Sequence, residues 1–469
     1  MTIEVTETNS PGWWIVKGVK KLNLRLPRLQ KLAGYHDGEP PLPVPVGSGA
    51  SDAFRSFQKK ACTNFAELIV GSIRERCAIR EIRTAVSADQ VDDVAWQIWK
   101  NNGLDVEFSD VLENMLALSD AYMIVGQDED GEIVITGEDP RQVVTFHNPA
   151  RQSEVRAAMK VFHDSDEKRD YIYLYLPGER QDDGAMSNAR RWVAYRDRSG
   201  PGKGISFSPS TYVWDDTRGG VDGEELNHPI VPVVRFRNRR GIGEFEPHLD
   251  VLDRINHKTY NAMVIAAYQA FKQMVIQVDM DGATDEDGNE LDSIPDNVLT
   301  TDPGSWIQLP YNSKVFQTAQ ADMQGIQSAI KDDIRELAAV TRRPLAMFAP
   351  DNESASGAQA NVEGLIFATE DKQVRCTSAL VDVLYIAFLT LGDEERANKA
   401  KITLDWKPAS RYAVTDKASA AAQAVTSLAK RTIMREIWQF GPEQVAQAEA
   451  EAADEALLAE ELTGGGNAA

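Results

Sequence analysis

The sequence predicts an α+β protein built from several modules. Period-two alternation of apolar residues is concentrated between residues 120 and 200, helical spacing dominates the remainder, and 469 residues suffice for about two to four modules. Because consecutive strands are separated by short turns, we expect residues 1–240 to form one module with a mostly antiparallel sheet. Beyond residue 243, we expect two long helices with a small insert between them.

The composition excludes several classes of protein. Asp and Glu total 72 against 50 Lys and Arg, which gives a net charge of -22. A basic groove that wraps nucleic acid is therefore not expected. An acidic wall would still let DNA slide past without trapping it. Cys62, Cys77 and Cys376 are odd in number and widely spaced, which indicates neither a disulfide framework nor a zinc cluster. The N-terminus has no signal-peptide pattern and no unbroken apolar run approaches the ~18 residues of a membrane span, so we expect a soluble protein made in a cytoplasm.

Helices precede strands in the first module. Residues 1–50 are expected to be irregular, apart from one or two helical turns in 24–32. Four prolines in 40–45 impose an extended strap at the end of this segment. An Asp-Gly turn predicts a hairpin of 122–125 with 133–135. Helices are expected at 52–80, at 87–101 with Ser87 as N-cap and at 105–120 after Gly103, and further strands at 142–146, 156–162, 171–176 and 191–195.

Two long helices dominate the second half of the chain. No proline or glycine interrupts residues 248–274, and the apolar residues of 246–275 recur at helical spacing, which predicts a helix of ~45 Å. A second helix is expected at 322–342, before Pro344. The apolar stripe expected to pack against other copies of the chain contains Tyr260, Val264, Phe271 and Met274.

An acidic insert and a long loop accompany these helices. Residues 276–305 contain nine acids and no Lys or Arg, with strands expected at 275–278 and 306–309. Residues 343–360 are too long for a simple connection, so a functional or disordered loop is expected there. The remaining expected elements are a helix at 361–391 ending at Gly392, a strand at 402–406, and helices at 415–430, 432–440 and 443–462.

A search for catalytic chemistry finds no established motif. Phosphate-binding loops, zinc-protease and serine-hydrolase patterns are missing, and the six histidines never fall at metal-ligand spacing. After Asp285–Gly288 the acidic insert lacks the glycine and glutamate of a calcium loop, so a solvated turn or a docking surface is favoured. An enzyme that acts on nucleic acid through metal-bound carboxylates in 279–292 remains an alternative.

Two pairs of residues have both a structural and a functional interpretation. Arg342 and Arg343 end the second long helix, where they can complement the helix dipole and pair with Asp332 or Glu336, or contact DNA phosphates. Trp96 and Trp99 lie three residues apart on a helix, where core packing is favoured over a base-stacking platform because few basic residues accompany them.

The order of these elements resembles the portal proteins of tailed bacteriophages, specifically the SPP1-like portal family of actinobacterial phages. The resemblance covers residues 24–440 and depends on the order of short motifs rather than on one specific signature. Ala358-Gln-Ala360 departs from the family pattern, because relatives more often have an acid after the Ser-Gly pair. The motifs are Leu26-Pro-Arg-Leu-Gln-Lys-Leu-Ala-Gly-Tyr35-His-Asp-Gly-Glu-Pro-Pro-Leu42, Asn64-Phe-Ala-Glu-Leu-Ile-Val70, Trp96-Gln-Ile-Trp-Lys-Asn-Asn-Gly-Leu-Asp105, Arg237-Asn-Arg-Arg-Gly-Ile-Gly-Glu-Phe-Glu-Pro247, Leu252-Asp-Arg-Ile-Asn256, Leu337-Ala-Ala-Val-Thr-Arg-Arg-Pro344, Ser354-Ala-Ser-Gly-Ala-Gln-Ala360 and Glu363-Gly-Leu365.

The resemblance implies a portal fold and a ring of twelve copies around a channel at one capsid vertex. It implies a virion protein that is assembled in the bacterial cytoplasm and has no enzymatic activity, no cofactor and no membrane contact. Another oligomeric phage head protein, such as a scaffold or an adaptor, remains an alternative, although such proteins are usually shorter and lack the order of stem, clip and stem. The implied parts are an α+β wing at 1–243, stem helices at 244–275 and 321–342, a clip at 276–320, a tunnel loop at 343–360, a wing-closing helix and strand at 361–410, and a helical crown with its tail at 411–469.

The implied partners follow from packaging and ejection of the genome through the ring. Double-stranded DNA passes non-specifically, the terminase large subunit and the head-completion connector dock at the clip, and the major capsid and scaffolding proteins surround the ring. Candidate docking residues in the clip are Asp285, Glu286, Asp287 and Glu290, and candidate tunnel residues are Arg342, Arg343, Ser354 and Ser356.

Overall fold

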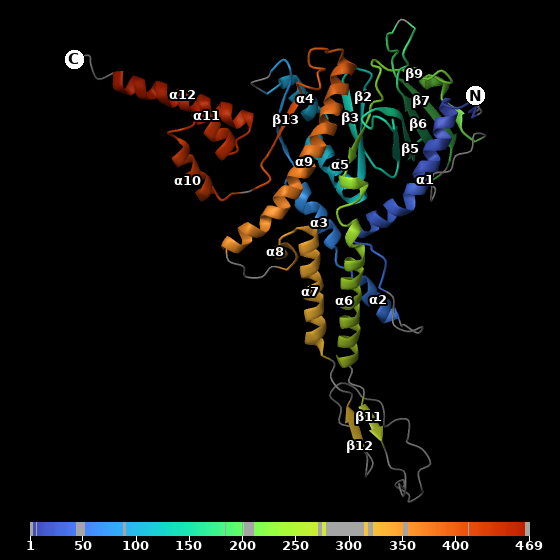
Figure 1. The fold of residues 1–469 in the computed structure, drawn as a ribbon, viewed down its shortest axis with the longest axis vertical. Helices are drawn as coiled ribbons and strands as arrows, with labels where there is room; N and C mark the ends of the chain where they lie inside the picture. The colour runs from blue at the N-terminus through green and yellow to red at the C-terminus, as the bar shows by residue number, and fades with distance from the viewer. Residues whose placement is uncertain are drawn as a thin grey trace, which may run out of the picture. The chain divides into compact units, whose positions relative to one another are not determined.

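The structure, a computed structural model, confirms the α+β class, with 50% of residues in helices and 18% in strands (Figure 1). The chain divides into two compact units: the larger comprises Met1–Pro40, Asn64–Asp250 and Leu337–Ala469, and the smaller comprises Pro41–Thr63 and Val251–Glu336. The structure describes residues 3–5, 7–43, 52–87, 91–182, 184–198, 200, 211–270, 274–277, 314–317, 322–349, 355–410 and 412–464.

The described strands of the larger unit pair antiparallel, as the sequence predicts. The predicted hairpin is confirmed, with Val125 opposite Ile135. The first sheet contains, in this order, β4 (Val143–His147), β5 (Val155–Asp164), β6 (Arg169–Leu176), β7 (Arg190–Asp197) and β8 (Val213–Trp214), and β9 (Glu224–Glu225) also pairs with β7. The second sheet has the order β10 (Val233–Arg237), β2 (Asp120–Gln127) and β3 (Ile133–Glu138). The third sheet pairs β1 (Ile79–Arg83) with β13 (Thr403–Trp406).

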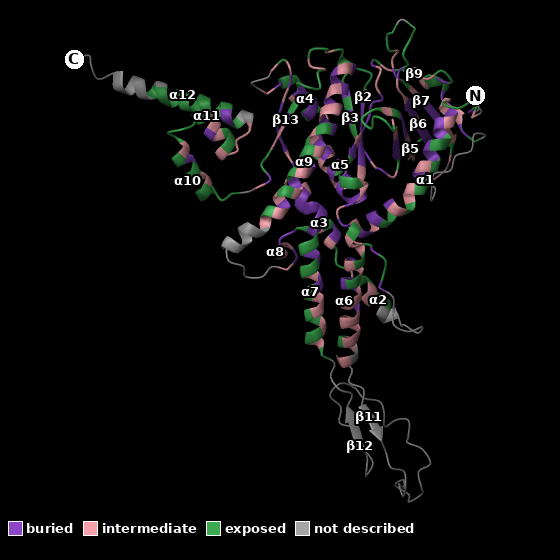
Figure 2. Cartoon of the chain, viewed as in Figure 1, coloured by how far each residue is buried: buried purple, intermediate pink, exposed green. Residues whose placement is uncertain are grey.

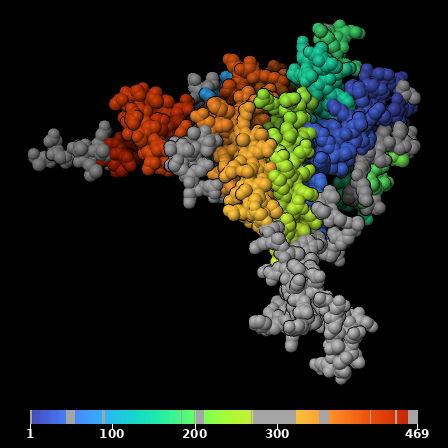
Figure 3. All heavy atoms as spheres, turned by 60° about the horizontal axis from the view of Figure 1, so that its bottom comes forward, coloured from blue at the N-terminus to red at the C-terminus, as the bar shows by residue number. Residues whose placement is uncertain are grey.

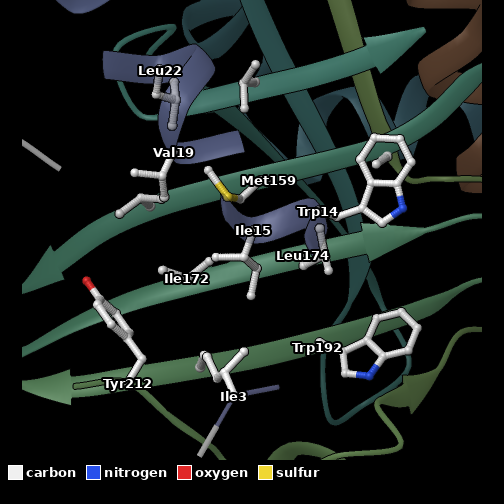
Figure 4. Packing of buried hydrophobic residues seen from close by; sticks show 14 of the residues in the cluster. Ile3, Trp14, Ile15, Val19, Leu22, Met159, Ile172, Leu174, Trp192 and Tyr212 are labelled. Carbon is white, nitrogen blue, oxygen red and sulfur yellow. The ribbon is translucent and has the colours of Figure 1, made fainter. Parts of the chain in front are cut away.

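Helix α1 (Pro11–His36) corrects the prediction of an irregular N-terminus. It contains Pro27, whose missing N–H costs helix stability, but its apolar stripe is buried on the first sheet, and that burial outweighs the cost. Figure 4 shows Ile15 and Val19 of this stripe among the sheet residues. Gly18 permits the close approach, because a Cβ there would lie 2.6 Å from the sulfur of Met159.

Two further helix boundaries differ from the prediction. The helix expected at 52–80 is split into α2 (Asp52–Lys60) and α3 (Phe65–Arg74), because Asn64 caps a new helix by accepting a bond from the Glu67 N–H at 3.2 Å. Strand β1 follows and was not predicted. Helix α4 (Asp93–Asn101) is capped by Asp92 rather than Ser87, because the Asp92 carboxylate accepts from two backbone N–H groups of the first turn.

Two helices pack on the second sheet and complete the core, whose buried residues Figure 2 marks. Helix α5 (Leu104–Leu118) begins after Gly103, as predicted. Helix α9 (Ala355–Leu391) ends before Gly392, also as predicted. The Trp99 side chain is buried and its indole N–H donates to the Asp105 carboxylate at 2.9 Å, which agrees with core packing.

The smaller unit contains two long helices and a strand pair. Helix α6 (Leu249–Ala270) follows the short η3 helix (Glu246–His248), and α7 (Met323–Thr341) agrees with the second predicted helix. Strand β11 (Met274–Gln277) agrees with the predicted strand at 275–278, but it pairs with β12 (Lys314–Gln317), which was not predicted. The expected strand at 306–309 lies outside the described residues.

Short helices complete the described chain. They are η1 (Asp216–Arg218), η2 (Arg239–Gly241), α8 (Leu345–Phe348), α10 (Val414–Ala424), α11 (Lys430–Thr432), the π-helical turn η5 (Ile433–Ile437) and α12 (Pro442–Gly464). Among the described helices, one segment, Val362–Leu391 of α9, is long and apolar enough to cross a membrane by those criteria alone, and 50% of it is buried inside the protein. The core helix of a soluble protein meets the same criteria, so this is weak support for a membrane span.

Candidate functional site at the junction of helices α7, α8 and α9

Helix α7 ends in a sharp reversal of the backbone. Arg342 has a φ of +57°, a left-handed conformation that stops the helix, and the Arg343 N–H still donates to the Ala338 carbonyl at 3.0 Å. Pro344 then begins the single turn of α8. Phe348 at the end of this turn packs on Phe65 of α3, with ring centroids 5.4 Å apart. The reversal is therefore held against α3 by an aromatic contact.

The Arg343 side chain lies inside the protein and is only 2% exposed. Its guanidinium donates to the Ser72 hydroxyl at 2.7 Å, and to the carbonyls of Thr341 at 2.7 Å and Ile69 at 3.1 Å. These bonds join the end of α7 to the end of α3. The expected contact of Arg343 with DNA phosphates is therefore wrong for this structure, because its donors are already used inside the fold.

A buried ion pair continues this network into α9. The Lys372 ammonium, which is 5% exposed, lies 2.8 Å from the Glu244 carboxylate and 2.9 Å from the Asn238 side-chain oxygen. The second oxygen of Glu244 lies 3.5 Å from the Arg343 guanidinium. Two cations therefore share one carboxylate, and the pairing expected for Arg343 with Asp332 or Glu336 is replaced by a pairing with Glu244.

The electrostatics of Glu244 follow from this geometry. Burial opposes ionisation of its carboxyl, but the charge and hydrogen bond of Lys372, the Asn238 amide and the charge of Arg343 outweigh burial and hold the pKa of Glu244 below its ordinary value. The carboxylate is thus ionised at neutral pH. Removal of Glu244 or of one of its two cations would leave a buried charge without full compensation, which is costly in the interior of a protein.

Sequence reasoning missed Glu244, Lys372 and Ser72 as members of this junction. The sequence gives little signal for Lys372, because Glu370, Asp371, Gln373 and Arg375 surround it and make this turn of the helix look like a solvent-exposed one. The sequence does not indicate which acid pairs with this lysine, since Glu244 lies more than 100 residues away.

The tunnel loop predicted at 343–360 is shorter than expected. Helix α8 occupies Leu345–Phe348, and α9 already begins at Ala355, so a structureless loop over the whole range is wrong. The helix extends into this segment because three alanines among residues 355–360 favour it. Ser356 lies in the first turn of α9, and Ser354 lies outside the described residues. The Arg342 side chain is exposed, and its proposed contact with DNA stays a prediction.

Helices α6 and α7 are joined by ion pairs in the smaller unit. The Asp333 carboxylate of α7 lies 3.0 Å from the Arg254 guanidinium and 2.7 Å from the Lys258 ammonium of α6. The Arg254 guanidinium also pairs with Glu336 at 2.6 Å. These contacts hold the two long helices side by side, although the sequence did not predict them.

The residues predicted for packing along α6 have different outcomes. Tyr260 is buried and Val264 is half-buried. Phe271 lies outside the described residues. Met274 lies on strand β11 instead of the helix, because the helix ends at Ala270 and the hairpin pairing with Gln317 begins at Met274.

The acidic insert cannot be compared with the structure. Asp285, Glu286, Asp287 and Glu290 lie outside the described residues, as do the carboxylates of the alternative metalloenzyme. Within the part of the chain that the structure describes, no group of three or more His, Cys, Asp or Glu side chains is arranged to hold a metal ion. A cavity of about 510 Å³ lies between the first two sheets, where Lys160 pairs with Glu138 at 2.7 Å.

The described structure therefore has a larger α+β unit and a smaller unit with two long helices joined by ion pairs. Residues 19–457 match the family model described as phage portal protein, SPP1 Gp6-like. The chain belongs to this family of phage portal proteins. No curated protein sequence matches the chain significantly.

This membership establishes the general function. The protein is a bacteriophage portal protein, a capsid component through which the DNA genome is packaged. Its interactions are those of capsid assembly and DNA packaging.

Proposed function

We propose that twelve copies of the chain form the ring at the portal vertex, that α6 and α7 line its stem, and that double-stranded DNA passes through it during packaging and ejection. The pairing of both long helices through Asp333 supports a stiff, two-helix stem. The α+β body would be the wing of a portal fold, β11 and β12 would begin the clip, and the helices beyond residue 411 would form the crown. In this role the protein has no enzymatic activity of its own and no membrane contact.

The observation that carries the ring is a set of large apolar side chains that α9 and α7 leave exposed. Phe367 and Val374 of α9 are 64% and 72% exposed, and Val340 of α7 is 46% exposed. Phe367 and Val374 are seven residues apart and therefore lie on the same side of α9, and exposed apolar side chains grouped in this way favour a protein interface. A neighbouring copy would cover this face in a closed, head-to-tail ring.

The acidic insert would be the docking surface of the clip. Its carboxylates, Asp285, Glu286, Asp287 and Glu290, would attract a basic surface of the terminase large subunit and later of the head-completion connector. This assignment depends on the charge of the sequence and on family membership, because the insert lies outside the described residues.

The junction of α7 and α9 would border the channel. Arg342 is exposed at the reversal, and Ser354 and Ser356 are close to it in the sequence. Weak, salt-sensitive contacts of the Arg342 guanidinium with phosphates would let DNA move without being held. Arg343 would serve the channel indirectly, by anchoring the reversal to α3.

Electron microscopy of the purified protein, with mass photometry, tests the ring and the α9 face together. We expect closed rings from the unmodified chain and loss of rings from Phe367→Asp with Val374→Asp, because each copy would bury two unpaired charges. The matched control replaces exposed apolar residues elsewhere, Met186→Asp with Val221→Asp, and should keep the rings. Rings that survive the α9 substitutions would contradict the assigned face, and unmodified protein that never forms rings would contradict the assembly.

A further inference from the structure

Helix α1 is strongly basic in a protein that is strongly acidic. Residues 11–36 contain six Lys and Arg and no Asp or Glu, whereas the whole chain has a net charge of -22. Arg25 is paired with Asp120 at 2.9 Å and Arg28 with Glu246 at 2.5 Å. In the described part of the chain, Lys17, Lys20, Lys21 and Lys31 form no ion pair with a carboxylate. The Lys17 ammonium lies 4.4 Å from the centre of the Trp13 ring and the Lys31 ammonium 5.9 Å from that of Tyr35, and these contacts leave the net positive charge uncompensated.

The helix presents these charges on a face that also exposes apolar side chains. Its other side is buried on the first sheet through Ile15, Val19 and Leu22. The outward face contains Leu24, which is 75% exposed, and Val16, which is 38% exposed. Lys17, Lys20 and Lys31 are exposed around them. Figure 3 shows blue N-terminal residues at the surface of the larger unit.

Neighbouring cations crowd one edge of this face. Burial, together with the charges of Arg25, Arg235 and Lys17, lowers the pKa of Lys21 to about 8. The Lys21 ammonium donates to the Thr145 carbonyl at 2.8 Å and lies 4.6 Å from the centre of the Phe146 ring. Strand β10 adds Arg235 and the exposed Arg237 beside it. The Asp120 carboxylate, which pairs with Arg25 at 2.9 Å, offsets part of this repulsion, and a further anion bound at the face would relieve more of it, which favours an acidic occupant.

The composition of the face distinguishes between two anionic partners. A DNA backbone rewards Lys and Arg but gains little from an exposed leucine. A protein interface typically has an apolar centre and a charged rim. Leu24 lies between Lys20 and Lys31 along the helix, and Val16 lies beside Lys17 and one turn before Lys20, so the exposed apolar side chains are bordered by lysines, as in such an interface.

We propose that the outward face of α1, formed by Val16, Lys17, Lys20, Leu24 and Lys31, docks an acidic amphipathic helix of a different protein. Leu24 and Val16 would receive the apolar side of that helix, and the lysines would pair with its carboxylates. The proposal is independent of the ring assembly, because it requires only the larger unit of one chain.

The test uses a synthetic helix of about 18 residues, five turns, with leucine on one face and glutamate on the other. Two control peptides replace all its glutamates with lysine or all its leucines with serine, and a short duplex DNA serves as the competing anion. Binding to the full-length protein is measured by fluorescence anisotropy at ~0.15 M salt.

We expect the Leu/Glu peptide to bind and both control peptides to fail. Lys17→Glu with Lys20→Glu and Lys31→Glu should weaken binding about tenfold or more, and Leu24→Ser alone should also weaken it about tenfold. A charge-matched control, Lys331→Glu with Lys401→Glu and Lys430→Glu, reverses exposed lysines elsewhere and should retain binding. Unchanged thermal unfolding shows that each variant is folded.

The proposal is wrong if the Leu/Glu peptide does not bind to the unmodified protein. It is also wrong if the α1 variants bind this peptide as tightly as the unmodified protein does. Duplex DNA that binds through the three lysines and is indifferent to Leu24→Ser would make the face a nucleic-acid contact. Loss of oligomers in the lysine variant would make it an interface between copies of this chain.

Discussion

Replacing Arg343 with glutamine is expected to destabilise the larger unit strongly. The guanidinium makes three internal hydrogen bonds, to Ser72, Thr341 and Ile69, and faces Glu244 at 3.5 Å. Glutamine is shorter and uncharged, so it cannot reach all of these acceptors. The substitution leaves buried oxygens without donors and leaves Lys372 as the one remaining cation beside Glu244.

The size of the loss follows from the burial of the pair. Removing one partner of a buried, hydrogen-bonded ion pair typically costs about 3–5 kcal/mol. The 2% exposure of the Arg343 side chain places it in that range rather than in the range of about 0–1 kcal/mol for surface pairs. Lys372 still neutralises part of the Glu244 charge, so we expect about 3 kcal/mol.

Chemical denaturation followed by tryptophan fluorescence measures this loss, and the neighbouring arginine provides the control. Arg342→Gln changes the same residue type at the adjacent, exposed position and should alter the free energy of unfolding by less than about 0.5 kcal/mol. A double-mutant cycle with Glu244→Gln then isolates the coupling, which should exceed about 1 kcal/mol. Equal stability of the Arg342→Gln and Arg343→Gln proteins would refute the buried network as the anchor of the junction.

Three further predictions concern pH, the stem and the channel. Because folding lowers the pKa of Glu244, the ionised carboxylate contributes fully to stability above pH 4.5, and this contribution is lost as the pH falls through the lower pKa of the folded state. The difference in the free energy of unfolding between the wild type and Glu244→Gln should therefore shrink in acid. A difference that stays constant with pH would contradict the ionised pair. Asp333→Asn should lower the free energy of unfolding by about 1–2 kcal/mol, because Arg254 and Lys258 lose the carboxylate that they share. Asp332→Asn, at an exposed position next to it, should change the free energy of unfolding little, and thermal unfolding of both variants measures the difference. Arg342→Gln should reduce the DNA packaged per ring without changing ring formation, and normal packaging would remove its role in the channel.

The order and type of most elements follow from local patterns in the sequence. Alternating apolar residues identify β2 and β3, and the Asp-Gly turn between them sets their pairing. Gly103 and Gly392 mark helix boundaries because both residues adopt the left-handed conformation that glycine accepts readily. These signals depend on residues that are close together in the chain, so they can be recognised from the sequence alone.

Long-range packing decided the places where prediction failed. Helix α1 tolerates Pro27 because a sheet more than 100 residues away buries its apolar stripe. Strand β1 exists because residues 403–406 supply its partner. Met274 leaves the helix because Gln317 pairs with it across the hairpin.

The candidate site shows the same division between local and tertiary information. The sequence alone determined that Arg342 and Arg343 end a long helix before Pro344, that the following segment is rich in small residues, and that the order of motifs resembles a portal protein. It could not distinguish the two arginines, which are adjacent and chemically identical. Only the tertiary structure separates them: the left-handed backbone at Arg342 turns its neighbour inward, where Ser72 and Glu244 converge from distant segments, and leaves Arg342 exposed. The physical reason is that burial and the choice of ion-pair partner depend on which segments meet in space, and residue type and spacing do not specify that.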